Sequence, residues 1–426
     1  RAIPDWTIQA ASLFTEADLF NRSRLAPSAG FWMQDSLYVV SCWPTYTDEE
    51  MDAVRDVLRS GRPNYLSGHV GRAFEQEFGA FHGDSHAVAV ANGTVALELA
   101  LLALGIGAGD EVVVTPRTFL ASASSIVMVG ARPVFAEVDP DSQNITPETV
   151  RAALTPRTRA IMAVHLAGWP CDMHGLRTLA EERSLKLIED CAQAHGAAID
   201  GKRVGTFGDA AAFSFCTDKI MSTGGEGGMV LFRDAAAHKW AWSYKDHGKG
   251  WDAVHVREHP PGFRWLHESF GTNWRMTEMQ AAIGRIQLRR LPEWLERRRA
   301  NAAVLEQALE GVPAVRVPRP PAGVSHARYK FYAFVRPEGL RAGWERDRIL
   351  DACHEAGAPG AQGSCSEIYR EKAFQDSGLA PPQRLDTARL LGETSLMFPV
   401  DHTIEPDAMR RIADAVRAVA LRASQG

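Results

Sequence analysis

The sequence has little of what marks an exported, membrane-spanning or nucleic-acid-binding protein. Its six cysteines form no CxxC pair, so neither a redox dithiol nor a zinc ribbon is predicted. The most apolar stretch, residues 87–104, is interrupted by Asn92, Gly93 and Glu98, which argues against a membrane span. The formal net charge is -5 and the basic residues are scattered, so we expect no nucleic-acid partner.

The N-terminal sequence and the cysteine spacing also indicate the cellular compartment and whether a metal site is present. The N-terminus has no basic segment followed by an apolar one, so we expect no export signal. Scattered free thiols are typical of a reducing compartment and predict a cytoplasmic protein. Two Cys-His pairs, Cys171 with His174 and Cys191 with His195, come near zinc-ligand spacing, but incidental proximity is the better interpretation and no metal site is predicted.

What is present indicates a folded enzyme or binding protein. The 426 residues are 45% hydrophobic and 23% charged, which suits a large domain with a smaller companion. Residues 1–42 carry aromatic residues without a clean period and are predicted to be an arm that packs on something. We expect a large domain over residues 43–300 and a small C-terminal domain over residues 301–426.

Strand-like and helix-like segments alternate through the first part of the chain, which is typical of an α/β fold. Strands are predicted over 87–90, 111–114, 133–136, 160–164, 185–188, 211–215 and 228–231, with helices over 95–104, 122–129, 147–153 and 173–183. This order predicts a mostly parallel sheet covered on both faces. Ligands of such sheets bind at the carboxyl ends of the strands. A strand near 330–336 and helices near 346–356 and 405–421 predict an α+β small domain.

Two further helices have local start or stop patterns. Thr47 is a predicted N-cap for a helix through Leu58, with Gly61 as its C-terminal cap. Pro292 is predicted to lie in the first turn of another helix, whose run Arg297-Arg298-Arg299 is interpreted as a solvated face.

Three strand ends carry residues suited to a planar, phosphorylated ligand. Asn92-Gly93-Thr94 precedes a helix start, where free N–H groups can bind a phosphate, although it is also an ordinary cap. Phe119, after the second strand, either covers a flat ring or packs in the core. Asp190 ends the fifth strand, where a carboxylate can hold a pyridinium nitrogen protonated. A solvated strand end and a magnesium site are the alternatives for Asp190.

The most informative segment runs from Ser214 to Gly228 and contains Lys219. Hydroxyls precede this lysine and four glycines follow it, a setting that suits a buried amine able to form a Schiff base. Glycine-rich loops are common, and this one lacks the spacing of a Walker motif. An ordinary loop is therefore the alternative interpretation of this segment.

The order of these motifs resembles one family. Asn-Gly-Thr, Thr-Phe, Glu-Asp-Cys-Ala-Gln, Ser-Phe-(three residues)-Lys, Gly-Glu-Gly-Gly and the run from Gly271 to Gly284 look like the DegT/DnrJ/StrS sugar aminotransferases. The resemblance extends from about Thr47 to the C-terminus. It implies a fold-type I transferase that depends on pyridoxal 5'-phosphate.

The resemblance also implies roles at matching positions. Lys219 would carry the cofactor as a Schiff base and shuttle a proton, and Asp190 would pair with the pyridine nitrogen. Gln193 would lie near the ring hydroxyl, and Phe119 would stack on the ring. The remaining residues implied to bind the cofactor, all at its phosphate, are Gly93, Thr94, Ser214 and, from the neighbouring subunit of a homodimer, Asn273.

This chain departs from many relatives beside the lysine, where Cys216, Thr217 and Asp218 replace an aromatic, a proline and a threonine. Asp218 is either a solvated loop carboxylate, which we favour, or a group that tunes the amine. Residues 363–369, which often approach the substrate in relatives, lack the expected histidine-rich pattern. Arg275 either binds a donor carboxylate or acceptor diphosphate, or is a surface residue at a helix start.

The expected reaction is transfer of an amino group from glutamate or glutamine to a keto sugar, with a nucleotide-linked sugar as the implied acceptor. Two enzymatic alternatives are a dehydratase and an aromatic-amine-forming synthase of the same family. Dehydratase relatives carry histidine in place of Lys219, which argues against the first. A non-catalytic, cofactor-binding regulator is the third alternative, and it has no need of Lys219, Asp190 and Gln193 together.

Overall fold

The computed structural model describes residues 41–262 and 264–425. Of the predicted N-terminal arm, residues 1–42, only Ser41 and Cys42 are among them. The prediction that the arm packs on something therefore falls outside the described residues.

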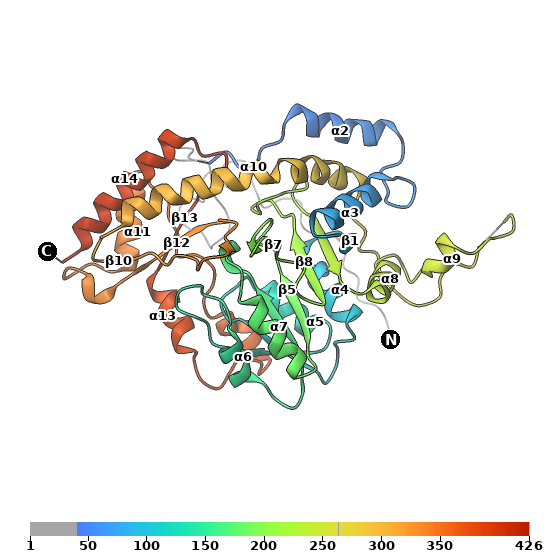
Figure 1. Cartoon of the computed structure of the whole chain (residues 1–426), viewed down its shortest axis with the longest axis horizontal. Coiled ribbons are helices and arrows are strands. Elements are labelled where there is room, and N and C mark those ends of the chain that lie inside the picture. Colours follow the sequence, from blue (N-terminus) through green and yellow to red (C-terminus); the bar gives the residue numbers. More distant parts are fainter. Residues whose placement is uncertain (1–40, 263, 426) are drawn as a thin grey trace, which may run out of the picture. The chain divides into compact units, whose positions relative to one another are not determined.

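A seven-stranded sheet forms the centre of the larger part, in the order β1-β9-β8-β5-β4-β2-β3. Three of its strands, β1, β5 and β8, are labelled in Figure 1. Its strands are β1 (His86–Val90), β2 (Glu111–Val114), β3 (Arg132–Phe135), β4 (Thr158–Val164), β5 (Lys186–Asp190), β8 (Ala210–Ser214) and β9 (Gly228–Phe232). Only β9 runs antiparallel to its neighbours, β1 and β8. The predicted, mostly parallel α/β sheet is confirmed, and every strand lies within two residues of its expected bounds.

The sheet is covered on both faces because successive side chains of a strand point to opposite sides. In β1, Val88 and Val90 belong to the core made with α4 (Gly93–Ala103), α5 (Ala121–Met128) and α8 (Ala235–Tyr244). Ala87 and Ala89 belong to the opposite core, with α3 (Val70–Phe81) and α10 (Glu278–Leu309). On further strands, Val113 and Ile161 pack in a core with α6 (Pro147–Ala153) and α7 (Met173–Glu182).

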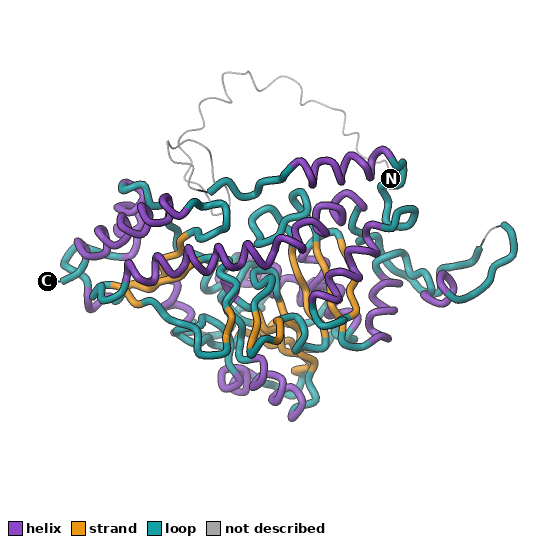
Figure 2. The backbone as a smooth tube through the Cα atoms, turned by 45° about the horizontal axis from the view of Figure 1, so that its top comes forward, coloured by secondary structure: helices purple, strands orange, loops and turns teal. Residues whose placement is uncertain are grey.

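Helix α10 differs from its sequence prediction. It runs for 32 residues with Pro292 inside it, so the predicted helix start at Pro292 is wrong. Figure 2 shows α10 as one long, uninterrupted purple helix. A proline inside a helix removes one backbone hydrogen bond, and the cores on which α10 packs hold the helix together through this position. Arg298 is buried and donates to the carbonyls of Arg328 and Tyr329, each at 3.3 Å. The predicted solvated face is therefore wrong for Arg298.

The C-terminal part has its own sheet and core. Strands β10 (Val315–Arg316), β12 (Phe331–Val335) and β13 (Ser395–Phe398) form an antiparallel sheet. It packs against α11 (Arg346–Glu355), α14 (Pro406–Ala423) and the end of α10. This α+β arrangement agrees with the predicted fold class, and α10 continues across the expected boundary at residue 300.

The remaining α-helices and strands are short or peripheral. They are α2 (Asp48–Arg59), α9 (Trp251–His255), α12 (Lys372–Asp376), α13 (Asp386–Thr394) and a small sheet of β11 (Val324–Ser325), β6 (Ala198–Ile199) and β7 (Lys202–Arg203). The predicted cap of α2 is confirmed, because the Thr47 N–H donates to Glu50 Oε2 at 2.7 Å and Gly61 has a φ of 67°. Within the described ranges, no helix combines the length and apolar character needed to cross a bilayer.

Candidate active site

The carboxyl ends of β1, β5 and β8 bring the predicted residues to one edge of the sheet. Gly93 begins α4 directly after β1, and Ser214 ends β8. The two lie so close that a Cβ on Gly93 would be 2.6 Å from the Ser214 Cβ and 2.9 Å from its Oγ. The first N–H groups of a helix have no partner within it. Glycine, hydroxyl and helix start therefore form a cradle that suits a phosphate.

The ordinary-cap interpretation of this turn also holds in part. The Asn92 side chain accepts a hydrogen bond from the Val95 N–H at 3.0 Å. Thr94 is exposed at the start of α4, where its hydroxyl is open to a ligand. Capping by Asn92 fixes the helix start without using the Thr94 side chain.

Asp190 is a buried carboxylate held by two donors. Its Oδ2 accepts from the Ser122 hydroxyl at 2.7 Å, and its Oδ1 accepts from the Ala192 N–H at 3.1 Å. Burial raises the pKa of Asp190, against the lowering effects of Ser122, Ala192 and the charge of Lys219. A buried carboxylate in this state is stabilised by a cation, which a protonated pyridine nitrogen would supply. The alternative of a solvated strand end is excluded by its burial.

Gln193 lies in the turn that follows β5. Its side-chain oxygen accepts a hydrogen bond from the Ala167 N–H at 2.7 Å, and the side chain is buried. This bond fixes the amide group and leaves its NH2 to act as a donor.

Lys219 lies in the loop between β8 and β9, and its side chain is 15% exposed. Its ammonium is 3.3 Å from Asp218 Oδ1 and 5.3 Å from the centroid of the Tyr329 ring. Its backbone carbonyl accepts a hydrogen bond from Trp43 Nε1 at 2.8 Å. The lysine is thus largely enclosed while its main chain is fixed from another segment.

Two of the predicted cofactor-binding residues, Phe119 and Asn273, lie at the surface of the chain. Phe119 is 68% exposed, so its interpretation as a core residue is wrong. The backbone N–H of Ser122 donates to the Phe119 carbonyl at 3.2 Å, and the hydroxyl of Ser122 donates to Asp190. Phe119 is therefore close to the residue that holds Asp190. Asn273 is exposed and pairs through its backbone with Asp246.

Arg275 is not a free surface residue. Its guanidinium forms an ion pair with the buried carboxylate of Asp246, and its side chain is 13% exposed. Asp246 also contacts Lys249 Nζ at 3.1 Å. The structure thus engages Arg275 with a protein carboxylate, which competes with the predicted ligand role.

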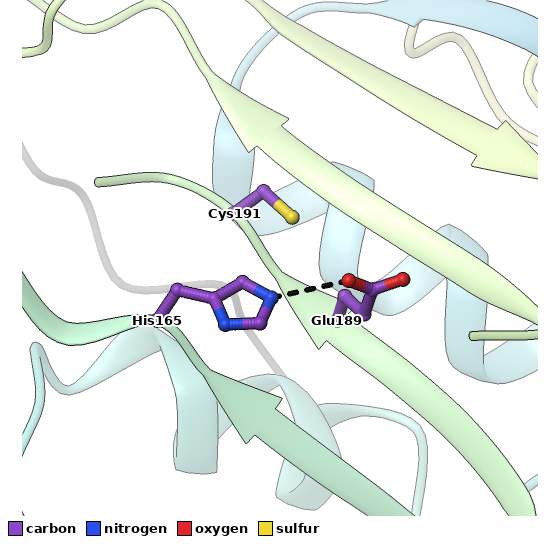
Figure 3. Close-up of side chains that lie close together, drawn as sticks. All are labelled: His165, Glu189 and Cys191. Carbon is purple, nitrogen blue, oxygen red and sulfur yellow. Dashed lines mark hydrogen bonds and ion pairs between the residues drawn. The ribbon is translucent and has the colours of Figure 1, made fainter. Parts of the chain in front are cut away.

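A group of possible metal ligands lies behind the site and has only Cys191 in common with the Cys-His pairs considered from the sequence. It consists of His165, Glu189 and Cys191, all buried (Figure 3). His165 Nδ1 accepts from the Cys171 N–H at 3.0 Å, so the proton is assigned to Nε2, which faces Glu189 Oε2 at 3.1 Å.

Glu189 is engaged on both oxygens. It accepts backbone N–H bonds from residues of the following loop, namely Gly205 at 2.7 Å, Phe207 at 2.8 Å and Gly208 at 2.6 Å. Burial raises the pKa of the Cys191 thiol well above its usual value. The His165 nitrogens and the Glu189 oxygens, which would have to bind a metal, are therefore engaged in hydrogen bonds within the protein. We assign the group to a structural hydrogen-bond network next to Asp190.

Several contacts of the site were not found from the sequence. Ser122 holds Asp190, Tyr329 donates a short hydrogen bond to Asp218, and Trp43 binds the Lys219 carbonyl. Each partner is distant in the chain, and none belongs to a motif whose spacing indicates the contact.

The mostly parallel sheet with helices on both faces is the fold of solved aminotransferases, and it makes this chain a fold-type I transferase of the class that uses pyridoxal phosphate. Residues 44–417 match the model of the DegT/DnrJ/EryC1/StrS aminotransferase family, and the chain belongs to that family. It is accordingly a pyridoxal-phosphate-dependent aminotransferase.

Individual relatives cover nearly the whole chain. An aminotransferase structure from Psychrobacter cryohalolentis is 51% identical, has a TM-score of 0.88, and covers 89% of this chain and 98% of its own. The UDP-N-acetyl-3-dehydro-alpha-D-glucosamine 3-aminotransferase of Acidithiobacillus ferrooxidans is 36% identical over 87% of this chain and 93% of its own. The 3-amino-5-hydroxybenzoate synthase of Amycolatopsis mediterranei is 38% identical over 81% of this chain and 86% of its own.

Proposed function

We propose that this enzyme transfers an amino group from glutamate or glutamine to a keto sugar linked to a nucleotide. The observation that carries the proposal is the enclosed Lys219, whose charge acts on the buried Asp190, in a chain two of whose relatives are named as an aminotransferase and a transaminase of UDP- and dTDP-linked sugars. Six free cysteines support a reducing compartment such as the cytoplasm.

Each site residue has a proposed task. Gly93, Thr94 and Ser214 bind the cofactor phosphate, Gln193 donates to the ring hydroxyl, and Phe119 covers the ring, which would bury its exposed face. Asp190 keeps the ring nitrogen protonated. Bound pyridoxal phosphate supplies a conjugated ring that accepts the electron pair left when a proton leaves a substrate carbon. Lys219 would take that proton at Nζ and deliver it to the cofactor carbon that is attached to the same nitrogen.

The site is proposed to be shared between two copies of the chain. Asn273 is exposed at its side chain, and nearby Phe270 is fully exposed, which is unusual for a large apolar side chain. We propose that this segment reaches the partner's phosphate cradle in a homodimer. Within each copy, the site lies between the proposed large domain, residues 43–300, and the small domain, residues 301–426, which contributes Tyr329.

Absorption spectroscopy tests the cofactor and donor steps. Wild-type protein with added pyridoxal phosphate should show a visible band that Lys219→Ala lacks, and glutamate or glutamine should bleach it. A band that no amino donor bleaches would support the non-catalytic alternative. No band at all would overturn the proposal.

A substrate panel then distinguishes sugar from aromatic-amine formation. The bleached enzyme should regain its band with a nucleotide-linked keto sugar and not with a cyclic keto acid. The reverse result would favour a synthase like the relative from Amycolatopsis mediterranei.

Mixing two inactive variants tests the shared site. Lys219→Ala and Asn273→Ala should each be inactive, and co-refolding them should restore on the order of a quarter of wild-type activity, because each mixed dimer has one intact site. If the mixture stays inactive while it is dimeric by light scattering, Asn273 acts within its own chain.

A further inference from the structure

Asp218 precedes Lys219 directly, and its carboxylate faces the lysine ammonium with both oxygens. Lys219 Nζ lies 3.3 Å from Oδ1 and 3.4 Å from Oδ2. The Asp218 side chain is 55% exposed, so solvent screens the attraction in part. Asp218 is thus a solvated loop carboxylate, as favoured from the sequence, and is at the same time paired with the lysine.

Tyr329 fixes this carboxylate from the other side. The tyrosine is buried, and its hydroxyl donates a short hydrogen bond to Asp218 Oδ2. Its own backbone is held by the Ala167 carbonyl, to which its N–H donates at 2.9 Å. Burial and the charge of Asp218 raise the pKa of Tyr329 well above its usual value, so the hydroxyl stays a donor.

The same ring also faces the lysine. Lys219 Nζ is 5.3 Å from the centroid of the Tyr329 ring, within the range of a cation–π contact. Desolvation raises the pKa of Asp218, but the charge of Lys219 and the Tyr329 hydroxyl outweigh it and lower the pKa overall. Asp218 therefore stays ionised beside the ammonium, held in place by a residue of the C-terminal part.

We propose that Asp218 is a further catalytic residue, which with Tyr329 holds the Lys219 ammonium during the part of the cycle when the lysine is not bonded to the cofactor. The inference rests on the proposed role of Lys219. A carboxylate within about 4 Å favours the charged form of an amine. Asp218 therefore stabilises the lysine just after it takes up a proton and keeps Nζ at a defined position.

The test uses the apoprotein and needs no turnover. Addition of the lysine amine to free pyridoxal phosphate requires the uncharged amine, so the rate of appearance of the visible band reports its protonation as pH is varied. With Asp218→Asn, the midpoint of this pH dependence should move to lower pH by about one unit. Asp218→Glu keeps the negative charge, so its pH midpoint should lie close to that of the wild type.

Tyr329→Phe separates a fixed carboxylate from a merely nearby one. It keeps the ring and removes the hydroxyl, so the midpoint should move in the same direction by less. In the Asp218→Asn background it should cause no further shift, because the two residues act as one unit. Glu226→Gln removes an exposed carboxylate from the same loop and should leave the midpoint unchanged.

An unchanged midpoint in Asp218→Asn overturns the proposal, as does an equal shift in Glu226→Gln, which would indicate general loop charge. If Asp218→Asn does not fold by circular dichroism, an unchanged midpoint in Tyr329→Phe overturns it instead. If wild-type protein forms no band, the proposed function fails first, and the two failures are thereby distinguished.

Discussion

Gly93 and Ser214 are packed so closely that the site has no room for a side chain at position 93. A Cβ there would lie 2.6 Å from the Ser214 Cβ, far inside van der Waals contact. The contact joins the end of β1 to the end of β8, 121 positions apart by residue number. The proposed phosphate cradle thus depends on a glycine for its shape.

We expect Gly93→Ala to weaken binding of pyridoxal phosphate by at least about tenfold, since a displaced cradle loses on the order of 1.4 kcal/mol or more. Fluorescence titration of the apoprotein measures the dissociation constant. Gly107→Ala is the matched control, because a Cβ there meets its nearest atom, the Val129 carbonyl oxygen, at 3.6 Å. Equal affinity of the two variants would contradict the cradle.

Asp190→Asn should stabilise the apoprotein while it removes activity. Burial raises the pKa of Asp190 in the folded state, so the folded protein binds a proton more readily than the unfolded chain does. Stability therefore falls as pH rises from the unfolded pKa through the folded one. At pH 7 the asparagine variant should therefore be the more stable of the two apoproteins.

Thermal unfolding of both apoproteins between pH 4 and pH 8 measures this difference. The difference in stability between the two apoproteins should become smaller as pH falls, because Asp190 then becomes protonated and neutral like asparagine. With cofactor added, the order should reverse, since only the carboxylate can hold the ring nitrogen. A wild-type apoprotein that is the more stable at pH 7 would refute the argument.

Ser122→Ala removes one of the two donors to Asp190. Loss of a hydrogen bond to a buried carboxylate costs about 1–3 kcal/mol, so the donor half-reaction should slow by roughly ten- to a hundredfold. Stopped-flow absorbance after glutamate addition measures the rate. Ser124→Ala on the same helix is the control, and a similar loss in both variants would indicate damage to α5 instead.

Trp43→Phe tests the hydrogen bond to the Lys219 carbonyl, which is 2.8 Å long. A phenyl ring takes the place of the indole, so the change mainly removes an N–H donor whose hydrogen bond is worth about 1 kcal/mol. Cofactor affinity should fall by roughly fivefold, as measured by titration. Unchanged affinity would mean that the loop is held without this bond.

Lys245→Met tests a buried ion pair away from the site. Lys245 Nζ is fully buried, lies 2.7 Å from Glu75 Oε1 and donates to the Ala89 carbonyl at 3.1 Å. Removing it leaves a carboxylate without its cation and should cost about 3–5 kcal/mol in urea unfolding. Adding Glu75→Gln should recover part of the loss, and Lys239→Met, at an exposed pair, should change stability by less than about 1 kcal/mol.

Much of the fold and part of the site followed from local sequence patterns. Periodicity and turn residues are properties of neighbouring positions, so the strands and the helix caps at Thr47 and Gly61 could be predicted. Parallel strands end at one edge, so Gly93, Asp190 and Ser214 could be expected to meet. Pro292 could not be interpreted this way, because its place inside α10 depends on packing that no local pattern contains.

The sequence alone determined the family and the sheet and singled out Lys219 as the predicted cofactor lysine, because these depend on the order and spacing of short motifs. Tertiary structure decided how the lysine is held. Tyr329 reaches Asp218 across 111 positions, and Ser122 reaches Asp190 across 68. Such contacts come from packing between separate elements, whose geometry is set by the whole core and not by the residues on either side.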